Sequence, residues 1–260
     1  YTMRSTALIG LTALALLVAV TAKPNWRVKN GAEVNKEDLP YVVGLHSGST
    51  LCTGTIIGDN LVLTAAHCMC GPSKMTHVYP ALTTFTKGIY PTDQWAIGSY
   101  VMEGNAKAEC EAGQKPMGGH DMALVKIAKA KFDFGPKVAQ TTLSPKEGHN
   151  EPATIAGYGQ DENYESGTLL KGSINFIGSC HVLTTHQSRA ICYDITKNWQ
   201  VTRPGDSGGP ALDSSNRLMG VNSGSINVST STGVLLHQHG VMASVKANMD
   251  FIKNAKTMLA

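Results

Sequence analysis

The residues around Ser207 have the composition that a nucleophilic serine requires. Residues 205–210 read GDSGGP, with glycines on both sides of the serine. Glycine permits a tight turn and a close approach of the backbone to a ligand, because it has no Cβ. The backbone N–H groups of Gly205 and Ser207 can then converge on one oxyanion. A Gly-rich turn between two strands has the same composition, so the interpretation depends on whether the chain also supplies a base.

Two further stretches supply the partners of such a serine. His67 lies in TAAHC (residues 64–68), directly after an apolar run, and Asp121 begins the apolar stretch DMALV (residues 121–125). A neutral imidazole takes the proton of a serine hydroxyl and returns it to the leaving group. A buried carboxylate fixes the tautomer of that imidazole and stabilises the imidazolium. We therefore predict that Ser207 is the nucleophile and that His67 is its general base.

These motifs resemble those of the chymotrypsin-like serine proteases. They occur in the family's order, His67, Asp121 and then Ser207, and the resemblance covers roughly residues 28–260. It implies an all-β fold with two six-stranded antiparallel Greek-key barrels packed together and a C-terminal helix. It also implies an oxyanion hole made by the N–H groups of Gly205 and Ser207, and a protein or peptide substrate.

The N-terminal residues have the features of a secretory signal peptide. Arg4 is followed by an apolar run over residues 7–20 and then by small residues that end at Ala22. We expect cleavage after Ala22 and a secreted, extracellular protein. A buried or membrane helix is the alternative, but the run is too short to span a bilayer comfortably.

The resemblance and the signal peptide divide the chain into five parts. The expected order is a signal peptide (1–22), a short activation propeptide (23–27), an N-terminal barrel with His67 and Asp121 (28–136), a connector (137–151) and a C-terminal barrel with Ser207 and a final helix (152–260). Within these parts we expect strands near 41–46, 51–57, 153–157 and 169–182. The interval between His67 and Asp121 is expected to be a long surface loop with extra strand pieces near 95–101. The apolar spacing over 245–259 predicts a helix.

The junction between Arg27 and Val28 resembles an activation site. Val28 and Gly31 fit the family's mature N-terminus, whereas residues 29–30 (KN) depart from it. In the family, the freed α-amino group pairs with the aspartate before the nucleophile, which is Asp206 here. The resemblance thus implies a zymogen that is activated by forming an ion pair between Val28 and Asp206. For Arg27 alone, an ordinary solvated charge in a linker is the alternative.

Six cysteines in a secreted chain indicate disulfides, and the number alone allows 15 pairings. The resemblance implies two of them, Cys52–Cys68 and Cys180–Cys192, which leaves Cys70–Cys110. Zinc is the alternative for the cluster at residues 67–70, but its spacing is not a normal zinc pattern. We therefore expect no metal and no cofactor.

The charge of the chain gives no reason to expect binding to nucleic acid or to a membrane. The formal net charge of +3 arises from residues 1–27, which contain three basic residues and no acid. The remaining 19 basic residues balance the 19 acidic ones. We see no additional interaction element, and we expect a monomer.

Specificity is also inferred from the resemblance. Twelve residues lie between Cys192 and Gly205, as in many relatives, which permits an ungapped alignment. The alignment places Val201 at the floor of the substrate pocket, where trypsin-like members carry an aspartate. It places Gly240 in the wall of the pocket, where glycine leaves the pocket open. The edge strand that pairs with substrate backbone would be formed by Ser223, Gly224 and Ser225.

We therefore expect cleavage after apolar residues, aromatic ones included, because Val201 cannot pair with a substrate Arg or Lys. Such an enzyme would not process itself at Arg27, and a separate trypsin-like protease would have to activate it. Arg203 replaces the cysteine of a family disulfide beside the pocket. It either favours an acidic group near the pocket or is a solvent-facing charge.

Two other functions remain as alternatives. A catalytically silent binding or regulatory protein can share the protease fold, but such proteins usually lose a triad residue, and all three are present here. An esterase can use the same triad, since acyl transfer does not require an amide. The motif order and the junction after Arg27 favour a protease.

Overall fold

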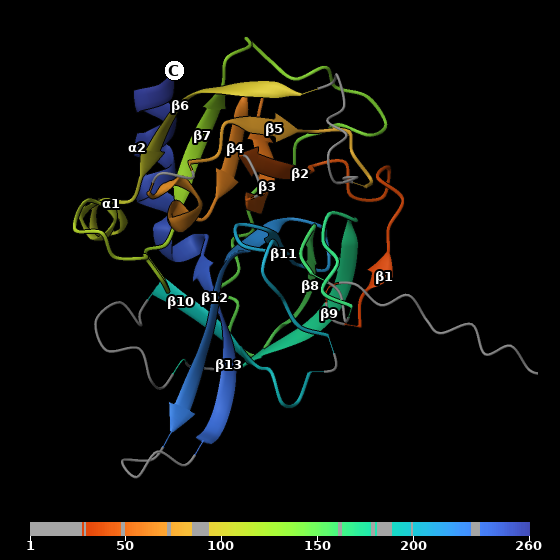
Figure 1. Ribbon diagram of the computed structural model, residues 1–260, viewed down its shortest axis with the longest axis vertical. Helices are drawn as coiled ribbons and strands as arrows, with labels where there is room; N and C mark the ends of the chain where they lie inside the picture. The colour runs from red at the N-terminus through yellow and green to blue at the C-terminus, as the bar shows by residue number, and fades with distance from the viewer. Residues whose placement is uncertain are drawn as a thin grey trace, which may run out of the picture.

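The computed structural model describes residues 28, 30–47, 50–71, 74–84, 94–160, 163–177, 180, 189–198, 200–229 and 235–260. Within this part of the chain, two antiparallel β-sheets pack on each other and a helix ends the chain (Figure 1). This is the all-β architecture with a C-terminal helix that the sequence predicts. The expected signal peptide and propeptide lie outside the described residues.

The first sheet is a closed six-stranded barrel. Its strands pair in the order β2-β3-β4-β7-β6-β5. Their bounds are β2 Val42–Ser47, β3 Thr50–Gly58, β4 Leu61–Thr64, β5 His77–Tyr79, β6 Trp95–Met102 and β7 Ala123–Ile127. Aliphatic side chains fill the interior, and Leu45, Ile56, Leu63 and Leu124 are all fully buried. Each such side chain contributes about 1.5–3 kcal/mol when it leaves water.

The second sheet contains seven strands in the order β1-β9-β10-β13-β12-β11-β8, and β8 also pairs with β9. Strands β8 to β13 therefore form a closed ring, and β1 adds to the edge of β9. The bounds are β1 Ala32–Glu33, β8 Pro152–Gly157, β9 Leu170–Ile177, β10 Ala190–Asp194, β11 Pro210–Leu212, β12 Leu218–Ser229 and β13 Leu235–Ser244. Strand β9 alternates buried and outward-facing residues, as expected of a barrel strand with one face on the core.

The N-terminal segment differs from the expected division of the chain. We assigned residues 28–136 to the first barrel, but β1 pairs with β9 of the second. Val28 is fully buried in the apolar core of the second barrel. An apolar residue at this position stabilises the packing of the segment against the second barrel.

Residues 128–151, all of them described, connect the two barrels without a long element. Isolated bridges join Gly135 to Val138 and Leu143 to Leu218. The last described residues form the short 3₁₀ helix η3 Lys246–Asn248 and then α2 Met249–Leu259, as the apolar spacing predicts. Among the described residues, no helix is long and apolar enough to cross a membrane.

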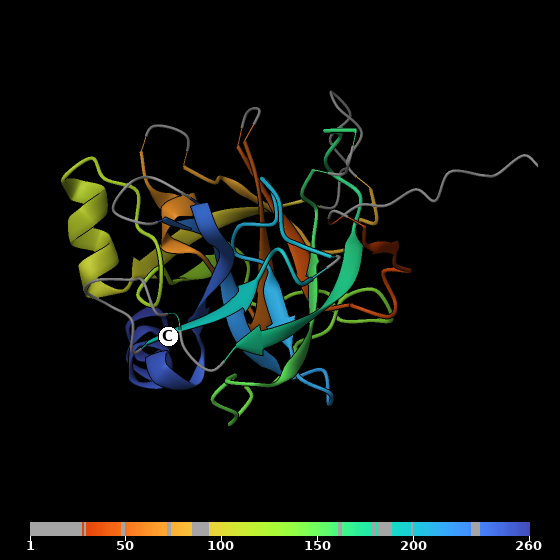
Figure 2. The ribbon, with the colours of Figure 1, turned by 90° about the horizontal axis from the view of Figure 1, so that it is seen from below.

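The segment between His67 and Asp121 is more regular than expected. Residues 95–102 form β6, a single strand of the first barrel, and α1 spans Gly104–Glu111. Glu103 caps α1, because its side chain accepts hydrogen bonds from the amides of Asn105 and Ala106. Figures 1 and 2 show α1 and α2 on the same side of the molecule, next to the first barrel.

Candidate active site

His67 and Asp121 are brought together by neighbouring strands of the first barrel. His67 lies in the 3₁₀ helix η1 Ala66–Met69, directly after β4, and Asp121 lies just before β7. Strands β4 and β7 are antiparallel, with Thr64 opposite Ala123, so both residues lie at the same end of the barrel. Asp121 Oδ2 is 2.7 Å from His67 Nδ1. The carboxylate thus selects the tautomer with the proton on Nδ1 and leaves Nε2 as the acceptor.

Asp121 is fully buried, and its carboxylate accepts hydrogen bonds from donors other than the imidazole. The backbone N–H of His67 donates to Oδ1 at 2.8 Å, and the Ser223 hydroxyl donates to Oδ2 at 2.6 Å. The backbone N–H of Gly118 donates in turn to Ser223 Oγ at 2.8 Å. These bonds offset the cost of burying the carboxylate. They also give Ser223 a second role, in addition to the substrate contact that the sequence suggested.

The loop that carries Ser207 is held against the first barrel. The backbone N–H of Thr53 in β3 donates to the carbonyl of Ser207 at 2.8 Å, and the Thr53 hydroxyl donates to the carbonyl of Gly205 at 2.9 Å. Gly205 has a φ of 100° and Gly208 a φ of 80°, in the region that favours glycine. A Cβ on Gly208 would lie 2.0 Å from Thr64 Oγ1. Glycine is therefore required where the loop meets the first barrel.

The predicted oxyanion donors are available in this loop. The backbone N–H groups of Gly205 and Ser207 have no hydrogen-bond acceptor among the described residues. The N–H of Gly208 is used differently, because it donates to the carbonyl of Asn222 at 2.8 Å. Free N–H groups next to a serine hydroxyl are suited to bind a negatively charged oxygen.

Asp206 is fully buried next to the nucleophile. Its carboxylate accepts hydrogen bonds from the backbone N–H groups of Gly159 and Arg203, both at 2.8 Å. Burial raises its pKa to about 7, although these two bonds act in the opposite direction. No described cation forms an ion pair with Asp206. In the folded chain, burial therefore favours the protonated carboxyl group of Asp206, or the ionised group when it is paired with a cation.

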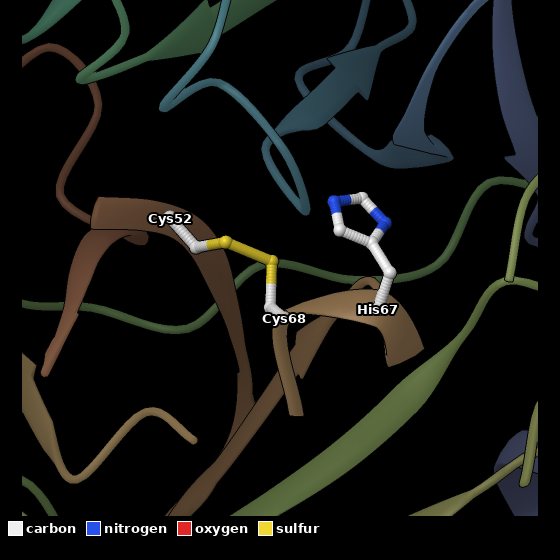
Figure 3. Close-up of side chains that lie close together, drawn as sticks. All are labelled: Cys52, His67 and Cys68. Atoms are coloured by element: carbon white, nitrogen blue, oxygen red, sulfur yellow. A yellow bond between two sulfur atoms is a disulfide. The ribbon is translucent and has the colours of Figure 1, made fainter. Parts of the chain in front are cut away.

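A cleft of about 520 Å³ contains His67, Gly205 and Ser207. The first barrel contributes residues of β3 and η1 to its wall, and the second barrel contributes the loop before β11 and residues of β12. The three predicted edge-strand residues, Ser223, Gly224 and Ser225, also line the cleft. Figure 3 shows the His67 imidazole pointing away from η1, with a disulfide beside it. The structure thus brings His67, Ser207, the predicted oxyanion donors and the predicted edge strand to one cleft, and Asp121 is buried next to His67.

The three disulfides of the structure join the pairs that the sequence analysis expected: Cys52–Cys68, Cys70–Cys110 and Cys180–Cys192. The first links β3 to η1 and the second links the end of η1 to α1, so η1 is anchored on both sides. Ligand atoms of Cys52, His67 and Cys68 lie within 4.8 Å of one another. Both sulfur atoms are bonded in a disulfide, so they offer no thiolate to a metal ion.

The pocket residues Val201 and Gly240 are not in the cleft. Val201 is 6% exposed and belongs to the core of the second barrel. The ring of Tyr193 lies on Gly240, since a Cβ there would be 2.1 Å from Tyr193 Cζ. Glycine at this position makes room for the tyrosine ring, and the expected role of Val201 and Gly240 in a substrate pocket stays a prediction. Tyr193 is not among the residues that the sequence predicts for the site, because its pairing with Gly240 depends on the register of β10 and β13.

A His–Asp pair and a glycine-flanked serine, in a cleft shared by two antiparallel barrels, are features of the chymotrypsin-like class of serine proteases. The chain matches the family model described as Trypsin over residues 28–252. It therefore belongs to the trypsin family.

Individual relatives are similar at a low level of identity. The Cercarial protease of Schistosoma mansoni is 28% identical over 251 residues, which cover 88% of this chain and 90% of that protein. A Trypsin-like protease of Streptomyces glaucescens is 29% identical over 219 residues, 80% of this chain and 76% of that protein. Trypsin Blo t 3 of Blomia tropicalis is 30% identical over 138 residues, 51% of this chain and 47% of that protein.

Proposed function

We propose that the chain is a secreted serine endopeptidase that hydrolyses peptide bonds through Ser207, His67 and Asp121. The observation that supports the proposal is that His67, which is hydrogen-bonded to the buried Asp121, lines the same cleft as Ser207. Its substrates are proteins or peptides, in line with the protease names of its relatives. We propose that it acts as an extracellular monomer without a cofactor and binds neither nucleic acid nor membrane.

In the proposed mechanism, Ser207 Oγ attacks the carbonyl carbon of the scissile bond while His67 Nε2 takes its proton. The carbonyl oxygen becomes an oxyanion and is bound by the N–H groups of Gly205 and Ser207. Each such donor typically contributes about 3–4 kcal/mol to the stabilisation of the transition state. Asp121 stabilises the imidazolium that forms and remains ionised itself.

The second half of the reaction releases the products. The intermediate collapses, the C–N bond breaks, and His67 gives its proton to the leaving amine, so that an acyl group remains on Ser207. A water molecule then attacks the acyl carbon, and His67 takes one of its protons. The same oxyanion site stabilises this second intermediate, and the return of the proton to Ser207 restores the enzyme.

We propose that the chain is made as a zymogen that is activated by cleavage between Arg27 and Val28. Asp206 is a buried carboxylate without a cationic partner among the described residues, and its raised pKa reflects that state. The freed α-amino group of Val28 would supply the missing cation. Val28 already belongs to the core of the second barrel. Val201 lies in the same core, and the loop that carries Asp206 directly follows Val201 in the chain.

The activating enzyme is proposed to be a separate trypsin-like protease. The charged residues that line the cleft are Lys115 and Arg203, and both are basic. A basic cleft repels the Arg27 side chain that would have to enter it. Purified precursor should therefore remain uncut at Arg27 until a trypsin-like enzyme is added.

Hydrolysis of a denatured protein tests the proposal. We expect the processed chain to degrade reduced, unfolded casein to peptides, and the Ser207→Ala variant, processed in the same way, to leave casein intact. Both samples should contain Val28 as the new N-terminus. If the processed chain with Val28 at its N-terminus leaves casein intact, the endopeptidase proposal is wrong and the silent binding protein replaces it.

A further inference from the structure

The side chain of Tyr193 in β10 lies against Gly240 of β13, and its hydroxyl group is hydrogen-bonded to Thr202, which lines the cleft. Tyr193 and Gly240 are partners in the register of these strands, which are neighbours in the second barrel (Figure 1). The ring is fully buried and rests directly on Gly240, where a Cβ would be 2.1 Å from Cζ and 2.5 Å from the hydroxyl oxygen. Glycine at position 240 therefore makes room for this ring.

The Tyr193 hydroxyl is held by a chain of hydrogen bonds. The backbone N–H of Thr202 donates to the tyrosine oxygen at 3.1 Å, and the Thr202 hydroxyl donates to Asn222 Oδ1 at 3.1 Å. The Tyr193 and Thr202 hydroxyl oxygens are 2.9 Å apart, and the tyrosine proton completes the chain. Burial raises the pKa of Tyr193, so the hydroxyl keeps this proton near neutral pH. The ring is thus fixed at both its face and its hydroxyl.

This chain of hydrogen bonds forms the boundary of the cleft. Thr202 and Asn222 line the cleft that contains Ser207, and Tyr193 lies behind them. The backbone of Asn222 also bonds to the nucleophile loop, since it accepts from the Gly208 N–H and donates to the Gly209 carbonyl. Thr202 and Asn222 therefore lie close to the loop that carries the reacting Ser207.

The reaction geometry shows which substrate residue meets this boundary. The acyl carbon must lie at Ser207 with its oxygen toward the Gly205 N–H, and the substrate backbone follows the strand at residues 223–225. The side chain on the residue before the scissile bond must then enter between that strand and Thr202. It meets Thr202 and Asn222, with the Tyr193 ring behind them.

We propose that Tyr193 determines specificity, by filling the space that a large side chain before the scissile bond would need, so that the enzyme cleaves after small residues such as Gly, Ala and Ser. The inference rests on the proposed endopeptidase function. It replaces the expectation of cleavage after aromatic residues, which assumed an open pocket at Gly240. The Thr202 hydroxyl and the Asn222 amide give the short pocket a polar base, which suits a serine side chain as well as an alanine.

The test compares peptide p-nitroanilides that differ only in the residue before the scissile bond, which is Ala, Ser, Leu or Phe. With processed wild-type enzyme, we expect kcat/KM for Ala to exceed that for Phe by at least about tenfold, because a rigid pocket rejects atoms that it cannot accommodate. In Tyr193→Ala, the ratio of Ala to Phe should fall by at least about tenfold. Tyr193→Phe keeps the ring and should keep the preference for small residues.

Labelling of each enzyme with a fluorophosphonate measures the active concentration and separates the possible failures. Labelled wild-type enzyme that cleaves the Phe substrate at least as fast as the Ala substrate would overturn the inference and leave the proposed function intact. Equal losses for all four substrates in Tyr193→Ala would also overturn it, since they indicate a purely structural role. Absence of both labelling and cleavage in the processed wild type would overturn the proposed function and the inference together.

Discussion

The active site contains two fully buried carboxylates whose partners differ. Asp121 accepts hydrogen bonds from the backbone and the imidazole of His67 and from the hydroxyl of Ser223. Asp206 accepts from two backbone amides, and no described cation pairs with it. A buried carboxylate remains ionised when donors and positive charge replace the lost hydration. In the proposed function, Asp121 therefore already has the partners that it needs in catalysis, whereas Asp206 receives its cation only after cleavage.

The raised pKa of Asp206 makes the stability of the unprocessed chain depend on pH. Burial raises this pKa from 3.8 to about 7, so between these values the folded state keeps a proton that the unfolded state has lost. The contribution of Asp206 to the free energy of unfolding is therefore largest at and below about pH 4 and falls as the pH rises toward about 7, above which it is constant. The change is on the order of 4 kcal/mol.

Urea denaturation of the precursor between about pH 4 and about pH 8 measures this dependence, with Asp206→Asn as the matched control. As the pH rises over this range, the free energy of unfolding of Asp206→Asn should increase relative to that of the wild type, by on the order of 4 kcal/mol. A difference that stays constant with pH would contradict the account. After processing at Arg27, the pH dependence of this difference should disappear between about pH 4 and about pH 8, because the α-amino group of Val28 then pairs with the carboxylate.

At the scale of elements, the active site depends on how closely the loop at residues 205–209 fits against β3 and β4. A Cβ on Gly208 would lie 2.0 Å from Thr64 Oγ1 and 2.3 Å from the carbonyl oxygen of Thr53. The φ of 80° at Gly208 adds backbone strain for any other residue. The loop can therefore not accept a side chain at this position without moving Ser207.

The variant Gly208→Ala tests this fit. We expect the free energy of unfolding to fall by about 1–3 kcal/mol, and kcat/KM of the processed enzyme to fall by at least about 100-fold because the nucleophile is displaced. Gly135→Ala is the control, since a Cβ there meets no atom within 4 Å, and it should change neither quantity measurably. Normal activity of Gly208→Ala would show that the loop is not held as described.

The elements also show why the sequence predicted some features and missed others. His67, Asp121 and Ser207 lie in short motifs whose residue types are fixed by the chemistry that they suggest, so these residues could be selected without a structure. Their catalytic roles stay a prediction. The strand pieces expected near 95–101 form one continuous strand, β6. Helix α1 was missed in a segment rich in polar residues, although Glu103 is a usable capping signal. Tyr193 was missed for a different reason: its effect depends on the pairing with Gly240, and pairing between distant strands is not visible in the sequence.

At the scale of the molecule, the site exists only where the two barrels meet. His67 and Asp121 come from the first barrel, whereas Ser207 and the strand with Ser223 come from the second. Hydrogen bonds across this interface, from Thr53 to Ser207 and from Ser223 to Asp121, hold the proposed nucleophile and the partner of His67 in place. The N-terminal segment is also packed on the second barrel through β1 and Val28, so a cut after Arg27 acts directly on the barrel that carries Asp206.

Covalent labelling of the serine is the most direct test of this account. The precursor, the precursor cut with trypsin and cut Ser207→Ala are each treated with a fluorophosphonate, and the modified residue and the new N-terminus are identified by mass spectrometry. We predict an adduct on Ser207 only in the cut wild-type chain, together with Val28 as the N-terminus. A cut chain that begins at Val28 and takes up no label would contradict the central claim that these residues form a working triad.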